Sequence, residues 1–225
     1  IGKLDERIKL LNQKMTDIRE GQVLFRVGEV LSSVVIQNGQ DEEVLRTELG
    51  KLLSQTNARI RDQLGIQNQN AVVLYISQDE IDQTITALHD APQGSKLVRI
   101  VAAGNIILGE PAMVHFELFD NKLVYHREEL VYEEHLQAQD VSGSAEYQVF
   151  RFLHEVNQQA VKRGVLPDPL TGNIGSLTAA EMFDTIQRIK ASGNGDIILR
   201  AVASTDIYTA GPLNIDIIVR SYAGQ

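Results

Sequence analysis

Residues 77–118 read SQDEIDQTITALHDAPQGSKLVRIVAAGNIILGEPAMVHFEL, and residues 178–219 read TAAEMFDTIQRIKASGNGDIILRAVASTDIYTAGPLNIDIIV. The two stretches align without a gap, so one pattern occurs twice in the chain. An internal repeat at a fixed period indicates a duplicated architecture, and it decides the fold before any single element does. The identical pairs include Glu80/Glu181, Thr84/Thr185, Ile85/Ile186, Gly94/Gly195, Arg99/Arg200, Val101/Val202, Ala102/Ala203, Ile106/Ile207 and Pro111/Pro212.

The stretches that precede this alignment match less closely. VLFRVGEVL from Val23 falls on LVYHREELV from Leu123, and Asn57 falls on Asn157. We therefore predict two tandem repeats, residues 21–120 and 121–225, packed as one globular head about an internal pseudo-twofold axis. The alternative is two unrelated halves that share ordinary α/β patterning.

The composition excludes several classes of function. The chain has 225 residues, 43% of them hydrophobic, which suffices for one large domain or two small ones. Its formal net charge of −9 repels nucleic-acid phosphate and anionic lipid heads, so we expect no nucleic-acid partner and no direct membrane contact. The chain has no cysteine, which excludes disulfides and cysteine nucleophiles. No apolar run approaches the length of a membrane span.

The first twenty residues carry a heptad pattern. Its apolar residues recur at alternating spacings of three and four and form one narrow apolar stripe, which is typical of the seam of a coiled coil. Two heptads are too few to be a stable coiled coil alone. We therefore predict that residues 1–20 are the end of a longer coiled-coil stalk, which pairs two chains as a homodimer. An amphipathic helix packed on the following domain is the alternative. The seam residues are Ile1, Leu4, Ile8, Leu11, Met15 and Ile18.

In the first unit, short apolar runs alternate with helical patterns. Asp41 and Gly65 bracket one predicted helix, and a capping box from Ser77 to Glu80 starts another. The turn residues Asp120-Asn121 predict a hairpin between the last strand of this unit and the first strand of the next. The predicted strands are 23–27, 31–36, 71–76, 97–103, 114–119 and 123–125.

The second unit repeats this order. A helix is expected at about residues 145–163, and Thr178 to Glu181 form a second capping box. The segment 166–175 is loop-like, where the first unit has a strand pattern. The fold class is therefore α+β with mixed sheets, built from two ββαβαββ repeats after a coiled-coil helix. The last strands are expected at 197–203 and 213–219, and the inward stripe of the second helix at Met182, Phe183, Ile186 and Ile189.

No pattern predicts a metal, phosphate or nucleophile site. The five histidines lack metal-ligand spacing, and His126 and His135 lie in a run of acids that is typical of a solvated face. Residues 193–195 precede a strand instead of opening a helix, and residues 172–176 give only a weak anion-binding pattern. We therefore expect a protein that is not an enzyme and that binds no cofactor and no metal.

A group of carboxylates supports one enzymatic alternative, a divergent ribonuclease-H-like nuclease or nucleic-acid-binding domain. Paired acids on neighbouring elements are what a two-metal nuclease needs. However, the positions equivalent to three of these acids are Ser95, Asn105 and His115, and the strands at Val23 and Leu123 carry no acid of the required kind. The carboxylates are Glu181, Asp184, Asp196, Asp206 and Asp216.

Arg99 and Arg200 occupy the same place in the two repeats, inside an apolar strand. A guanidinium in such a strand needs a partner. We expect each to form an ion pair with a helix acid, Glu80 in the first unit and Glu181 in the second. The functional alternative is a small-molecule sensor, in which Arg99 and Arg200 bind an anionic ligand between the repeats.

Three stretches of the chain resemble one uncharacterised family. They are GQVLFRVGEVL from Gly21, YQVFRFLHEVNQQAVKRGVLPDPLTGNIGSLTAAEMFDTI from Tyr147, and DIYTAGPLNIDIIVRS from Asp206. The family forms the C-terminal domain of membrane-anchored, myosin-like coiled-coil proteins of cyanobacterial type. The resemblance implies N-terminal transmembrane helices and a long coiled coil before this domain, with the head in the cytoplasm at the inner membrane. It implies no activity and no site residues.

The leading hypothesis combines these observations. We expect a non-enzymatic interaction or scaffold head that sits on a coiled-coil stalk and binds a protein partner. The heptads and the absence of a catalytic pattern are its basis.

Overall fold

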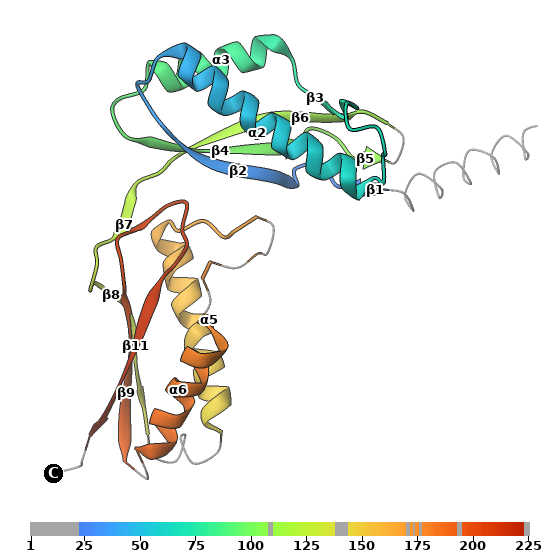
Figure 1. Cartoon of the computed structure of the whole chain (residues 1–225). Helices are drawn as coiled ribbons and strands as arrows, with labels where there is room; N and C mark the ends of the chain where they lie inside the picture. Colours follow the sequence, from blue (N-terminus) through green and yellow to red (C-terminus); the bar gives the residue numbers. More distant parts are fainter. Residues whose placement is uncertain are drawn as a thin grey trace, which may run out of the picture. The chain divides into compact units, whose positions relative to one another are not determined.

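The computed structural model confirms a mixed α+β fold (Figure 1). It describes residues 23–107, 110–137, 144–169, 172, 174–175, 177–192 and 195–222. The predicted heptad helix at residues 1–20 lies outside this range. The described residues divide into two compact units, and the boundary falls between Phe119 and Asp120.

The first unit places two helices on a four-stranded sheet (Figure 1). Strand order in the sheet is β2-β4-β6-β3, and β1 pairs separately with β5. One core, which includes Leu31, Leu49, Ile85 and Ile100, fills the space between helices and sheet. The elements are β1 (Val23–Phe25), β2 (Val30–Gln37), α2 (Glu42–Gln63), β3 (Leu74–Tyr75), α3 (Gln78–His89), β4 (Ser95–Ala102), β5 (Ile106–Ile107) and β6 (Ala112–Asp120).

The second unit packs two helices on a three-stranded sheet with the order β11-β9-β8, and β7 pairs separately with β10. A second core contains Phe152 and Val156 of one helix, Ile189 of the other, and alternate residues of the central strand. The elements are β7 (Leu123–Tyr125), β8 (Leu130–Leu136), α5 (Ala145–Arg163), α6 (Ala179–Ala191), β9 (Asp196–Ala203), β10 (Ile207–Tyr208) and β11 (Ile215–Tyr222).

The two units share the order of their elements and the pairing of their strands. In each unit, the second strand pairs with the strand that follows the second helix: β2 with β4, and β8 with β9. The short first strand of each unit pairs with a short strand near the end of that unit: β1 with β5, and β7 with β10. The one difference in order is β3, which has no equivalent strand among the described residues of the second unit. The ancestral duplication and the pseudo-twofold axis stay predictions.

The predicted hairpin at Asp120-Asn121 is wrong. Strand β6 pairs within the first sheet, whereas β7 pairs with β10, so the two strands do not form a ladder with each other. The cause is a set of non-local bonds: the backbone N–H of Thr209 donates to the Lys122 carbonyl, and Asn121 Oδ1 accepts from the Ala210 N–H. Asp120 still belongs to β6, and only Asn121 and Lys122 separate it from β7.

The helix starts follow their capping residues. In α6, Thr178 Oγ1 accepts from the Glu181 N–H while the Glu181 carboxylate accepts from the Thr178 N–H at 2.7 Å, which completes the predicted capping box. In α3, Ser77 Oγ accepts from the Glu80 N–H. The Glu80 carboxylate does not close the box, because it accepts a hydrogen bond from the Phe116 N–H at 2.7 Å on the outer edge of β6.

Because each unit has its own core, we expect a core truncation to destabilise one unit only. Phe152→Ala, at a fully buried side chain of α5, should lower the unfolding free energy of the second unit by about 3–5 kcal/mol. Native-state hydrogen exchange should then show faster exchange in β8 and β9, with β2 and β4 unchanged. The matched variant Leu49→Ala should give the reverse pattern, and equal loss of protection in both units would contradict separate cores.

Candidate functional site

Arg200 and Arg99 meet partners that differ from those predicted. Arg200 Nε lies 2.8 Å from Glu133 Oε2, and Glu133 is its neighbour in the register of β8 against β9. The expected partner, Glu181, belongs to the capping box instead, so the predicted helix ion pair is wrong for Arg200. The guanidinium of Arg99 lies 5.1 Å above the ring centre of Phe119, a cation–π distance. A ligand-binding role for Arg99 and Arg200 stays a prediction.

Three of the acids that suggested a nuclease, Glu181, Asp184 and Asp216, line one groove beside α6, but Glu181 and Asp184 already have partners there. Asp184 pairs with Arg188 at 2.5 Å, and Asp206 Oδ1 accepts from the Arg127 N–H at 2.8 Å. Asp196 and Asp216 stand at opposite ends of the ladder between β9 and β11. Within the described ranges, no group of three or more acids and histidines is placed to hold a metal ion.

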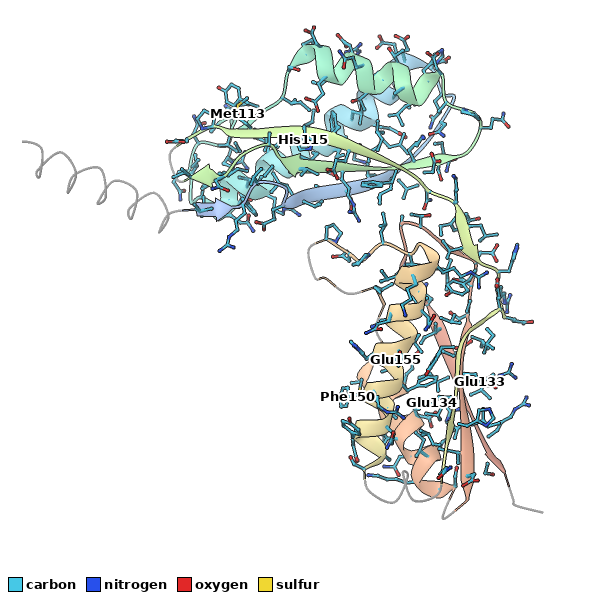
Figure 2. The ribbon with its side chains drawn as sticks, turned by 180° about the vertical axis from the view of Figure 1, so that it is seen from behind. Met113, His115, Glu133, Glu134, Phe150 and Glu155 are labelled. Carbon is cyan, nitrogen blue, oxygen red and sulfur yellow. The ribbon has the colours of Figure 1, made fainter. Side chains whose placement is uncertain are left out.

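The acidic run on β8 is tied to α5 by ion pairs. Glu134 lies 2.5 Å from Arg151, and Glu129 pairs with Arg163, whose guanidinium also stacks 4.1 Å from the ring centre of Tyr125. The His126 backbone N–H and then Arg163 lower the pKa of Glu129. Figure 2 shows Glu133 and Glu134 on the same strand. These contacts fix the strand to the helix, and they leave no open acidic pocket among the residues they involve.

The outward face of α5 is unexpectedly apolar. Tyr147, Phe150 and Val161 are 63%, 57% and 43% exposed, and Figure 2 shows Phe150 on the side of the helix away from the sheet. His154 and Gln158 lie between them at helical spacing, so the five residues form one stripe opposite the buried stripe of the helix. We call the stripe of Tyr147, Phe150, His154, Gln158 and Val161 the outer face of α5.

Helix α6 adds a third exposed aromatic ring. Phe183 is 62% exposed, although the sequence pattern placed it on the inward stripe. That prediction is wrong because α6 buries a narrower stripe, with Thr185 and Ile189 at its centre. Met182 and Ile186 pack at the margin of the core. The sequence did contain a signal for exposed rings, because α6 has more apolar residues than one buried stripe can hold. The same excess of apolar residues occurs in α5, where Tyr147 and Phe150 are exposed.

A hollow opens beside the C-terminal half of the outer face of α5. It has a volume of about 440 Å³ and is lined by His154, Asn157, Lys162, Pro167 and Ile174 among others. A smaller apolar pocket of about 170 Å³ shares Asn157 with it and is lined further by Met182 and Leu213. The predicted anion-binding loop, residues 172–176, lies only partly inside the described range, where Gly172 donates its N–H to the Asp168 carbonyl.

A close backbone contact forms the floor of the smaller pocket. The Leu213 N–H donates to the Ile174 carbonyl at 2.8 Å, and a Cβ at Gly175 would lie 2.1 Å from the Leu213 oxygen. Only glycine fits at such a distance. This contact replaces, in the second unit, the two-residue pairing of β3 with β6 in the first.

A groove of about 450 Å³ lies between α6 and β11. Its lining includes Leu177, Glu181, Asp184, Arg188, Ile215, Asp216 and Ile217. Arg188 reaches across, because its Nη1 donates to the Ile217 carbonyl at 3.3 Å while its Nη2 pairs with Asp184. The groove therefore runs along the outer edge of the sheet, where β11 has no partner strand among the described residues.

Comparisons with known proteins relate the second unit to an uncharacterised family. Residues 125–224 match the family described as the DUF3084-associated C-terminal helical hairpin. Helices α5 and α6 lie in that stretch, and Lys190 Nζ joins them through Glu146 Oε1 at 2.6 Å. The same stretch also contains the three-stranded sheet, so the two helices form one layer of a two-layer unit.

A relative resembles nearly the whole chain. It is an uncharacterised protein of Nostoc sp., 26% identical over 219 residues, which cover 94% of this chain and 42% of the relative. The chain thus spans less than half the length of that protein. No solved structure matches the chain. Within the described part, no helix is both long and apolar enough for a membrane crossing.

The close contact at Gly175 predicts that the methyl group of an alanine at this position would destabilise the second unit. Gly175→Ala should force Leu213 and the loop apart and lower the unfolding free energy of the second unit by about 1–3 kcal/mol. Chemical denaturation measures the change. Gly50→Ala, on exposed α2 with open space at the Cβ position, should instead raise stability by about 0.5–1 kcal/mol. A neutral Gly175→Ala would contradict the contact.

The capping box of α6 predicts a pH dependence. The Thr178 N–H lowers the pKa of Glu181 from its usual 4.5, so the carboxylate stabilises the fold above that value. This stabilisation should be lost as the pH falls through the lowered pKa of the folded state. Glu181→Gln removes the titrating group, so the stability difference between wild type and variant should shrink as the pH falls from about 6 to about 3. A constant difference would contradict the assignment.

Proposed function

We propose that this chain is a non-enzymatic interaction head, and that it binds a partner helix on the outer face of α5. The observation that carries this proposal is the exposure of Tyr147, Phe150 and Phe183, the three most exposed aromatic residues whose side chains are described. The chain has only 6 Tyr, 6 Phe and no Trp, so a quarter of its aromatic residues lie on the outside of two helices.

Exposed aromatic rings on a helix favour a protein partner. Aromatic side chains are enriched at interfaces, where a few of them supply most of the binding energy. Spacings of three and four residues along the outer face of α5 suit the apolar seam of a second helix, which buries such a stripe between two helices. The hollow beside Val161 and Lys162 offers room for a larger anchor at one end of the stripe.

We further propose the setting that the family resemblance implies. In this setting the head stands at the end of a coiled-coil stalk, which dimerises through residues 1–20 and is anchored in the inner membrane, with the head in the cytoplasm. The heptads and the description of the matching family as C-terminal support the proposal. The relative from Nostoc sp. has more than half of its length outside the matched region, which leaves room for such segments there.

The two alternatives draw less support from the described residues. A nuclease needs acids that are placed to hold metal ions. Glu181, Asp184 and Asp216 line one groove, but Glu181 caps α6 and Asp184 pairs with Arg188. Among the described residues, no group of three or more acids and histidines is placed to hold a metal ion. The small-molecule sensor rests on Arg99 and Arg200, each of which already has a partner within its own unit.

A photo-crosslinking experiment tests the docking proposal. A photoreactive phenylalanine analogue at position 150, in the full-length protein in cells, should crosslink one protein far more strongly than the same analogue at Tyr75, which is 50% exposed in the first unit. The captured protein is then purified, and its affinity for the chain is measured by calorimetry.

If the proposal is correct, the affinity of the captured protein for the chain depends on the aromatic ring of Phe150. Phe150→Ala should weaken binding at least about 10-fold, because truncating an interface anchor costs 1.4 kcal/mol or more, while Tyr75→Ala should leave it unchanged. Circular dichroism should show both variants folded, since both side chains are exposed. If Phe150→Ala left the affinity for the captured partner unchanged, the outer face of α5 would not be the docking site.

A further inference from the structure

The outer edge of the sheet is closed in the first unit and open in the second. In the first unit, β3 pairs with the start of β6, and further along β6 Glu80 accepts from the outward N–H of Phe116. In the second, the Leu213 N–H is satisfied by Ile174, but no described strand pairs with β11 on that side. An unpaired strand edge is a template on which a strand of another chain can pair, so we asked which strand fits this one.

The hydrogen bonds of β11 show which residues face outward. The Asn214 carbonyl accepts from the Ser204 N–H on the inner side, towards β9. The Leu213 N–H and the Ile217 carbonyl bond to Ile174 and Arg188 on the outer side. Since backbone groups alternate along a strand, the outward-facing residues are Ile215, Ile217, Val219 and Ser221.

The side chains of β11 alternate as well. Ile215, Ile217 and Val219 point towards the helices and contact the core. Asp216, Ile218 and Arg220 lie on the other face of the sheet, where both charged residues are exposed and Ile218 is partly buried. The charges are thus placed symmetrically about Ile218, one two residues before it and the other two residues after.

We propose that a second copy of this chain occupies the open edge, with β11 pairing antiparallel to β11 about a twofold axis at Ile218. In this register Ile217 of each copy exchanges backbone hydrogen bonds with Val219 of the other, and Ile215 does so with Ser221. Asp216 of each copy lies opposite Arg220 of the other in a non-hydrogen-bonded pair, where side chains are closest. The two three-stranded sheets become one continuous sheet.

Charge selects this register over its neighbours. An axis at Ile217 places Asp216 opposite Ile218, and an axis at Val219 places Arg220 opposite Ile218, so neither pairs the charges. A parallel arrangement in register puts Asp216 beside Asp216 and Arg220 beside Arg220, which is repulsive. The strand is therefore complementary to itself in one antiparallel register, as an isologous interface requires.

Arg188 caps the edge in the single chain. Its 3.3 Å bond to the Ile217 carbonyl is long, and its charge is already engaged by Asp184. When two copies pair, the Val219 N–H of the second copy takes over the Ile217 carbonyl, and Arg188 keeps its ion pair. The inference does not rest on the outer face of α5, so the two proposals fail or succeed separately.

The absence of cysteine makes the register directly testable in the full 225-residue chain. Ile218→Cys should form an intermolecular disulfide under mild oxidation, because the two copies of residue 218 form a non-hydrogen-bonded pair with Cα atoms about 4.5 Å apart, within disulfide range. Asp216→Cys is the matched control. Its two copies would lie four residues apart along the strands, roughly 13 Å, so no disulfide should form.

A charge exchange tests the pairing without new cysteines. By sedimentation equilibrium, Asp216→Arg and Arg220→Asp should each raise the dimer dissociation constant at least about 10-fold, since each creates two like-charge contacts. The double variant D216R/R220D should return it to within about threefold of wild type. Leu11→Lys, in the heptad segment, should leave the Ile218→Cys disulfide unchanged, which separates this interface from a stalk dimer.

Four results would overturn the proposal. One is a wild-type chain that stays monomeric at high micromolar concentration. Another is a dimer in which Ile218→Cys does not crosslink while Leu11→Lys dissociates it, which would assign dimerisation to the stalk. The third is a double variant no better than the singles, which would mean that Asp216 and Arg220 do not face each other. Crosslinking from position 218 to a different protein would assign the edge to that partner instead.

Discussion

The backbone groups at the outer edge of each sheet need partners, and much of this structure follows from how the two units supply them. A buried or half-buried N–H without a partner costs free energy comparable to a lost hydrogen bond. In the first unit, strand β3 and the carboxylate of Glu80 supply hydrogen-bond partners for this edge. The second has Glu181 at the equivalent place, but its carboxylate closes the capping box of α6. The same residue type therefore serves the sheet in one unit and the helix in the other.

Asn57 and Asn157 show the same divergence. Asn57 accepts from the N–H groups of Val73 and Leu74 and donates to the Ala71 carbonyl, which holds β3 against the sheet. Asn157, at the matching position, lines two adjoining hollows. Where the first unit uses its asparagine to complete its own structure, the second leaves one facing open space beside an exposed aromatic stripe. The second unit, which lacks an equivalent of β3 among its described residues, thus carries both hollows and the exposed aromatic stripe.

The sequence predicted what depends on neighbouring residues and missed what depends on register. The bounds of α5, the cap of α6 and most strands follow from periodicity and from local hydrogen bonding, and the structure confirms them. The partner of Arg200 was missed because Glu133 reaches it only through the pairing of β8 with β9, which no local pattern encodes. The exposure of Phe183 was missed because the apolar residues of α6 were assigned to one inward stripe, whereas packing buries a narrower one.

The pairing of distant strands also bears on how the chain folds during synthesis. Strand β2 meets β4 only after two helices have been made, and β8 meets β9 in the same way, so each ladder closes a long loop. Such topologies fold slowly, because the entropy of loop closure is lost before the contacts form. The last residue of β4, Ala102, is synthesised well before translation reaches β9 at Asp196. Because domains generally fold as units, N-terminal first, we expect the first unit to fold before the second has been synthesised.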